Sequence, residues 1–177
     1  MYNTYLSGVI TQFNLYRSLG EKAMAQMQND MLFWQYNAES NSVAIIVKHM
    51  AGNMLSRWTD IFNTDGEKEW RNRDAEFVND ISTREGLMAI WEQGWSCLFN
   101  TLNSLQEADL QKIIYIRNEP HTVMDAINRQ LAHYASHVGQ IIYIGKMVNN
   151  ENWKSLSIPR NRSADFNNDM FSKPRTP

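Results

Sequence analysis

Apolar side chains recur at helical spacing in four long segments of the chain, and polar segments with turn-forming residues separate them. The periodic segments lie at about 4–27, 43–62, 87–105 and 122–148. Each is far longer than an average helix of about 11–12 residues, and strands that could build a doubly wound sheet between them are missing. The pattern therefore predicts an all-α protein, a four-helix bundle with long crossover connections.

Turn and capping residues predict where these helices begin and end. Any residue of 40–42 (Ser-Asn-Ser) can cap the second helix, and the turn signal Asp-Gly at 65–66 follows its end. The sequence Ser-Thr-Arg-Glu at 82–85 has the form of a capping box before the third helix, and 122–125 offers a similar start to the fourth. Residues 113–116 (IIYI) are rich in β-forming side chains and are expected to be extended.

The last segment, 151–177, differs from the rest of the chain. It is polar, lacks periodicity and carries three of the 4 prolines. Trp153, Leu156 and Ile158 are expected to hold its first part on the bundle, and the end is expected to be loose. We therefore divide the chain into a bundle with its site, 1–150, and a C-terminal tail that packs on it in part.

Composition and charge exclude several classes of partner. Hydrophobic residues make up 43% of the chain, and the net charge is −2 with both signs interspersed, so the basic patch of a nucleic-acid-binding protein is missing. The apolar run VAIIV at 43–47 is too short to span a bilayer, and the first residues do not have the pattern of a signal peptide. A single cysteine, Cys97, cannot form an intramolecular disulfide. We expect a cytoplasmic protein without nucleic-acid or membrane partners.

Two histidines of the fourth helix are candidate metal ligands. In LAHYASHVGQI, His133 and His137 are four residues apart, which places both rings on the same face of a helix. Two buried neutral histidines side by side are difficult to satisfy with backbone groups, because helical amides are already bonded. A hydrogen-bonded pair, or one ring at the surface, is the alternative. Tyr134 stands where zinc proteases have the glutamate of H-E-x-x-H, so that chemistry is excluded.

A third histidine, His49, lies on the apolar face of the second helix. Alone it would be interpreted as a core histidine. In helix bundles, however, metal sites are built from inward residues of facing helices, and three imidazoles leave coordination positions open, as in catalytic sites. His49, His133 and His137 are therefore the predicted metal ligands. His121 follows a proline at a helix entrance, where a surface or capping role is expected.

Other polar side chains have less specific roles. Asn53 lies one turn after His49, and Gln140 nearly one turn after His137, so either could fix an imidazole or orient a metal-bound water. A buried amide that bonds to a neighbouring helix is the alternative. Cys97, between Trp95 and Leu98, is expected to be an inert small hydrophobic residue.

The segments that carry these histidines, AIIVKHMAGNMLSRWTD and INRQLAHYASHVGQIIYIGK, resemble the DinB-like superfamily of bacterial helical bundles. Within it, KHMAGNMLSRW, RNEPHTV, HYASHVGQIIYIGK and SLSIPR resemble a group of uncharacterised small proteins, and the likeness covers residues 1–160. The resemblance implies a divalent cation held by His49, His133 and His137, and a homodimer. Some relatives are transferases or isomerases that use a low-molecular-weight thiol, and others are described as metal-dependent hydrolases.

Two classes of function follow. In the first, the metal is catalytic, and the protein is a transferase acting on a small thiol and an electrophilic small molecule, or a hydrolase. In the second, the metal only stabilises a dimeric, non-catalytic bundle. A charged residue in the pocket, for which Arg57 and Arg129 are candidates, would distinguish the two. Zinc and nickel both suit imidazole. Thiol transfer is favoured over hydrolysis, because no obvious carboxylate base accompanies the histidines.

Overall fold

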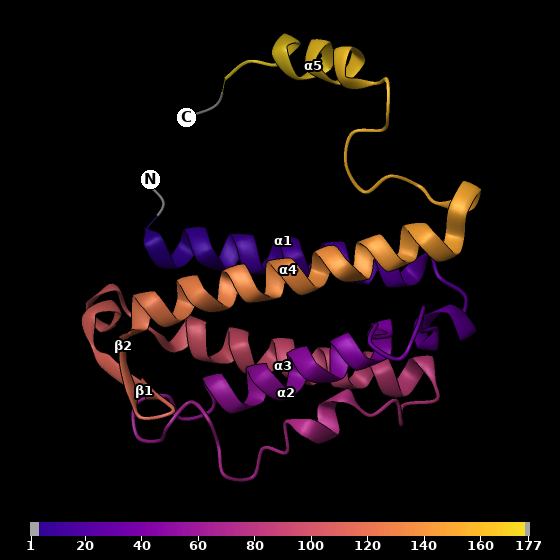
Figure 1. The fold of residues 1–177 in the computed structure, drawn as a ribbon. Coiled ribbons are helices and arrows are strands. Elements are labelled where there is room, and N and C mark those ends of the chain that lie inside the picture. Colours follow the sequence, from indigo (N-terminus) through magenta and orange to yellow (C-terminus); the bar gives the residue numbers. More distant parts are fainter. Residues whose placement is uncertain (1–3, 176–177) are drawn as a thin grey trace.

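The structure is a computed structural model that describes residues 4–175, and most of these residues are helical (Figure 1). The helices are α1 (Tyr5–Ala25), α2 (Val43–Trp58), α3 (Arg84–Ser104), α4 (Val123–Asn149) and the short α5 (Ser163–Ser172). Strands β1 (Ile113–Ile116) and β2 (Glu119–Thr122) pair antiparallel in a small hairpin between α3 and α4. The predicted mainly helical class is confirmed, and the run expected to be extended is β1.

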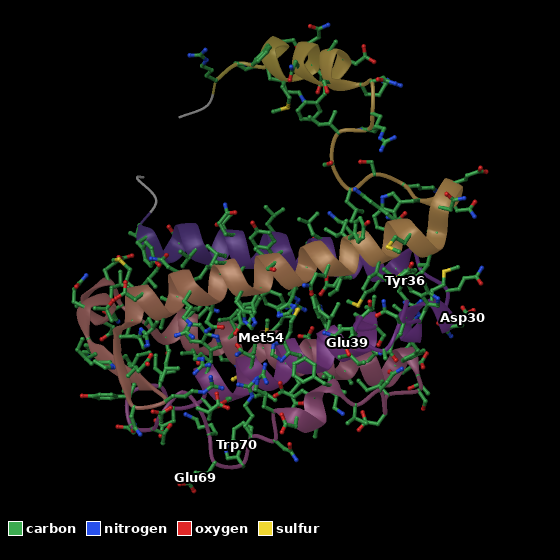
Figure 2. The ribbon with its side chains drawn as sticks, in the orientation of Figure 1. Asp30, Tyr36, Glu39, Met54, Glu69 and Trp70 are labelled. Atoms are coloured by element: carbon green, nitrogen blue, oxygen red, sulfur yellow. The ribbon has the colours of Figure 1, made fainter. Side chains whose placement is uncertain are left out.

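The four long helices share one hydrophobic core. Helix α1 runs beside α4, and α2 runs beside α3 (Figure 1). The approach of α2 and α3 is close at Gly94, where an added Cβ would lie 2.8 Å from the Cα of Ala51 and 3.2 Å from the sulfur of Met54. Met54 is labelled near the centre of the molecule in Figure 2. The largest fully buried side chains are aromatic: Trp58, Trp91, Trp95, Tyr134 and Phe13.

Capping residues account for the helix starts, with one correction. The hydroxyl oxygen of Ser42 accepts the N–H of Ile45 at α2, and that of Thr122 accepts the N–H of Asp125 at α4. The capping box expected at 82–85 does not form, because Thr83 caps α3 by accepting the N–H of Gly86. The capping residue is therefore Thr83 instead of Ser82, and the third residue of the helix is Gly86 instead of Glu85.

The predicted end of α2 was wrong. The helix ends at Trp58, four residues before the predicted end at 62. Asp60 has a left-handed backbone conformation, with φ of 48°, and its carbonyl oxygen accepts the N–H groups of Asn63 and Thr64. This turn begins the long connection 59–83, which the apolar spacing of Trp58 and Ile61 does not reveal.

The tail contains more regular structure than expected. Trp153 and Leu156 pack against the core, whereas Ile158 is 39% exposed. Residues 163–172, expected to be loose, form α5, all of whose residues are exposed. Helix α5 lies apart from the four long helices (Figure 1). Ion pairs Arg162–Asp165 and Lys173–Asp169 support it locally. Within residues 4–175, no helix combines the length and the apolarity needed to cross a membrane.

The hairpin is fixed to the connection 59–83 by the carboxylate of Asp65. This carboxylate accepts the N–H groups of Arg117 and Asn118 at 2.8 Å, and that of Glu67 at 2.7 Å. Arg117 and Asn118 form the tight turn of the hairpin with φ of 55° and 63°. Partial burial acts to raise the pKa of Asp65, but the three N–H donors outweigh it, so its pKa lies below the ordinary value.

We expect Asp65→Asn to lower the free energy of unfolding at pH 7 by about 1–2 kcal/mol, because the charged acceptor of three N–H groups is lost. Since the folded-state pKa is lowered, this stabilisation is present above the ordinary carboxyl pKa and is lost as the pH falls through the folded value. The difference between wild type and variant should therefore shrink in acid. Urea unfolding at several pH values measures it, with the exposed Asp169→Asn as control. Equal losses in the two variants would contradict the role of Asp65.

Candidate metal centre

Three histidines from two helices converge on one point. His49 comes from the middle of α2, and His133 and His137 come from successive turns of α4. Nε2 of His133 lies 3.0 Å from Nε2 of His137 and 3.4 Å from Nε2 of His49. One nitrogen of each ring lies within 4.8 Å of the others, so the three residues could hold a metal ion.

The other nitrogen of each ring faces an oxygen acceptor. Nδ1 of His49 lies 2.9 Å from Oε2 of Glu76. Nδ1 of His133 lies 3.3 Å from Oε1 of Gln130, and Nδ1 of His137 lies 2.9 Å from Oε1 of Gln140. These oxygens accept, so in each neutral ring the proton is on Nδ1 and the lone pair is on Nε2. Three lone pairs then face one another.

This arrangement fits a divalent cation. Three facing lone pairs repel one another, and no hydrogen lies between the Nε2 atoms in this tautomer. Zinc–imidazole bonds are about 2.0–2.1 Å long, so two nitrogens at a tetrahedral angle lie about 3.3 Å apart. The observed separations of 3.0 and 3.4 Å are close to that value. A carboxylate or amide oxygen on the distal nitrogen is the usual support of a metal-binding imidazole.

Glu76 is itself held by a buried ion-pair chain. Nε of Arg71 lies 2.7 Å from Oε1 of Glu76, and Nη2 lies 2.9 Å from Oε2. The ion-pair chain extends to Glu67, whose Oε2 lies 3.1 Å from Nη1 of Arg71. Burial acts to raise the pKa of Glu76, but His49 and Arg71 lower it more, so the group is a carboxylate at neutral pH. The side chain of Arg71 is only 3% exposed.

Burial and neighbouring charge favour the neutral form of His133 and His137. Burial, followed by the proximity of His137, His49, Arg57 and Arg71, lowers the pKa of His133 to about 4. Burial also lowers the pKa of His137, against the opposing hydrogen bond to Gln140. At neutral pH both rings are therefore in the form that binds metal.

Gly52 provides the space that the Glu76 carboxylate occupies. A Cβ at this position would overlap Oε1 of Glu76 and would lie 2.7 Å from its Cδ. Glycine at this position, one turn after His49 on α2, therefore leaves room for the Glu76 side chain, which a larger residue would have to displace.

We expect Gly52→Ala to weaken metal binding by about 10- to 100-fold, the usual effect of losing the group that supports a metal-binding imidazole. The added methyl group displaces Glu76 from His49 while leaving all three histidines in place. Gly8→Ala is the matched control, because a Cβ at Gly8 meets no atom within 4 Å. A competition titration with a metal-binding dye measures both affinities. Equal affinities would show that the Glu76 contact does not support the site.

The other residues singled out from the sequence lie in different places. Gln140 contacts His137 as described above, whereas Asn53 is bonded to the hydroxyl group of Tyr134 on α4, at 2.9 Å. His121 lies in β2 opposite Ile114, outside the cluster. Cys97 is half-buried on α3, with its sulfur 3.5 Å from the hydroxyl of Thr59.

Sequence analysis missed four residues that complete the centre: Glu76, Arg71, Gln130 and Gly52. Gln130 had a usable signal, because it precedes His133 by three residues on the same helical face. Glu76 and Arg71 had none, since they lie in an irregular connection with several other charged residues.

One cavity borders the histidine cluster, and a second approaches it through Gln140. The first, of about 270 Å³, is lined by His49 and His133 together with Asn53, Gln130 and five arginines, among them Arg57 and Arg129. The other, of about 820 Å³, lies between α4 and the connection from α1 to α2, and Gln140 is part of its wall. Its lining is rich in aromatic side chains: Trp34, Tyr36 and Tyr143. Figure 2 labels Tyr36 and Glu39 on this connection, close to α4.

The helical fold and the histidine cluster define a DinB-like protein with a possible metal site. The chain belongs to the family described as "Protein of unknown function (DUF1572)", which residues 1–162 match. This is a DinB-like family, so the resemblance seen in the sequence is confirmed. A search of curated proteins gave no match.

Proposed function

We propose that this protein is a four-helix-bundle metalloenzyme that transfers a low-molecular-weight thiol to an electrophilic small molecule. His49, His133 and His137 would hold one zinc or nickel ion through Nε2. The observation that carries the proposal is the orientation of the rings, with each Nδ1 facing an oxygen and each Nε2 facing the same point. Such an ion lowers the pKa of a thiol so that it stays ionised at neutral pH.

The lining of the smaller cavity favours a catalytic site over a purely structural one. A metal that only stabilises helices needs no cavity beside it, whereas this one contains Arg57 and Arg129, which can bind substrate. Among the described residues, no aspartate or glutamate lines the cavity. Glu76, the carboxylate beside the cluster, is already paired with His49 and Arg71 and is not placed to act as a general base. Thiol transfer needs no general base, whereas hydrolysis commonly uses one to take a proton from water.

The larger cavity suits the second substrate. Its volume of about 820 Å³ lies within the range of about 300–1,000 Å³ typical of small-molecule sites. Its aromatic and aliphatic walls suit an apolar electrophile. Gln140 lines this cavity and also contacts His137, so the cavity lies next to the histidine cluster. In the reaction, the thiol sulfur bonds to the electrophilic carbon, the leaving group departs with its bonding electrons, and the thiol proton goes to solvent.

Conjugation assays test the proposal. Metal-loaded protein should accelerate the reaction of a cellular thiol with an activated aryl halide, and chelation or His49→Ala should return the rate to that of the uncatalysed reaction. Several thiols should be compared, with His121→Ala as the control that keeps the cluster intact. If His49→Ala turns over as fast as wild type, the metal is not catalytic and a structural role replaces the proposal. Ester hydrolysis by metal-loaded protein without thiol transfer would instead identify a hydrolase.

A further inference from the structure

Five arginines from four segments of the chain line the cavity beside His49 and His133. One belongs to α2, two to the connection 59–83, one to the hairpin turn and one to α4: Arg57, Arg71, Arg73, Arg117 and Arg129. Guanidinium groups repel one another, so bringing them together requires compensating negative charge.

The protein supplies only part of that charge. The carboxylate of Glu67 lies 3.1 Å from Arg71, 3.2 Å from Arg117 and 3.8 Å from Arg57. Glu76 pairs with Arg71 and His49, and the Asp65 carboxylate is taken by three backbone N–H groups.

Two of the arginines remain without a carboxylate partner. Within residues 4–175, Arg73 and Arg129 have no aspartate or glutamate oxygen in ion-pair range. Arg73 instead lies over the ring of Phe77, which packs against His49. The cavity therefore has an excess of positive charge even when His49 and His133 are neutral.

One nitrogen of the Arg57 guanidinium group has no acceptor within residues 4–175. Its side chain is 5% exposed, and its Nη1 donates to the carbonyl oxygen of Gly66 at 2.9 Å. Its Nε is buried and has no hydrogen-bond partner in the described part of the chain. Buried polar groups are nearly always paired. Arg57 lines the cavity with a guanidinium group that the described part of the chain satisfies only in part, so an anion in the cavity would supply further acceptors.

We propose that this cavity binds an anionic group of the substrate, a phosphate or a pair of carboxylates, beside the histidine cluster. Arginine forks match the oxygens of both groups and donate two parallel hydrogen bonds. A volume of about 270 Å³ is close to the lower limit for small-molecule sites, so the cavity suits a charged head group whose remainder extends toward the histidines. The link between this subsite and thiol transfer rests on the proposed function, whereas the binding of the anion does not.

Calorimetric titration of the full chain with inorganic phosphate and with succinate tests the subsite, at low ionic strength where charge pairs are least screened. We expect one anion per chain, and affinity at least about tenfold weaker in Arg73→Gln and in Arg129→Gln. Both residues are exposed, so neither change threatens folding. The matched control is Arg160→Gln, an exposed arginine of the tail, which should bind the anion as wild type does.

The outcomes separate this inference from the metal proposal. His137 is not part of the cavity lining, so His137→Ala should lose metal and still bind the anion. Binding of phosphate alone or succinate alone supports the subsite and identifies the head group. Binding of neither, or equal affinity in the arginine variants and wild type, overturns it. Anion binding that disappears with the metal in His137→Ala also overturns it, because the histidine cluster would then be the anion site.

Discussion

Alanine at His49, His133 or His137 should remove nearly all bound metal from the protein. Wild type should purify with about one zinc or nickel ion per chain, and each variant should retain less than about a tenth of that, because two imidazoles hold a divalent ion far more weakly than three. One nitrogen of each ring lies within 4.8 Å of the others, so each ring can contribute one ligand to the same point. Elemental analysis after exhaustive dialysis measures the metal content directly.

Thermal unfolding gives a second measurement of the same site. A metal that binds only the folded chain stabilises it by mass action, so added zinc should raise the Tm of wild type and leave that of the three variants unchanged. His121→Ala is the control, because His121 lies in β2, outside the cluster. If one of the three variants keeps its full metal content, that histidine is not a ligand.

The candidate ligands could be predicted because they lie on periodic helices. His133 and His137 are separated by one helical turn, and His49 lies on the apolar face of α2. Their spacing alone therefore indicates that all three point into the interior of the protein. The direction of the His49 ring could not be predicted in the same way, whereas Gln140 and Gln130 lie one turn from His137 and His133 on the same helix. The direction of His49 depends on Glu76, which lies in the connection 59–83, where no periodicity relates a residue to the helix it touches.

The cavity lined by the five arginines could be predicted from the sequence even less. Arg57 and Arg129 could be suggested as pocket residues from their helices, but Arg73 and Arg117 reach the cavity from a loop and from a hairpin turn. Their positions depend on long-range contacts such as the Asp65 carboxylate bound to the hairpin, 52 residues away in sequence. Local propensities do not contain that information.

Helix ends were predictable where one side chain determines them. Ser42 and Thr122 cap α2 and α4 as their chemistry indicates. The end of α2 could not be predicted, because it depends on the left-handed backbone conformation of Asp60, a residue that is not glycine. Helix α5 has Phe166 and Met170 four residues apart, but its polar composition obscured this weak pattern.

Arg71→Met should cost about 3–5 kcal/mol of unfolding free energy, the usual effect of removing one partner of a buried ion pair. The side chain of Arg71 is 3% exposed and that of Glu76 is 7% exposed, so the carboxylate that remains is poorly hydrated. Methionine retains most of the side-chain volume, and the effect therefore reports the loss of charge and hydrogen bonds. Urea unfolding of the metal-free protein at pH 7 measures it.

Two further variants show whether the cost arises from an uncompensated carboxylate. Arg73→Met changes an exposed arginine two residues away, and it should cost no more than about 1 kcal/mol, the scale of its contact with Phe77. Adding Glu76→Gln to Arg71→Met should restore part of the stability, because the buried negative charge is then removed together with its partner. If Arg71→Met is no less stable than Arg73→Met, the ion-pair chain does not stabilise the fold, and the orientation of His49 must depend on packing alone.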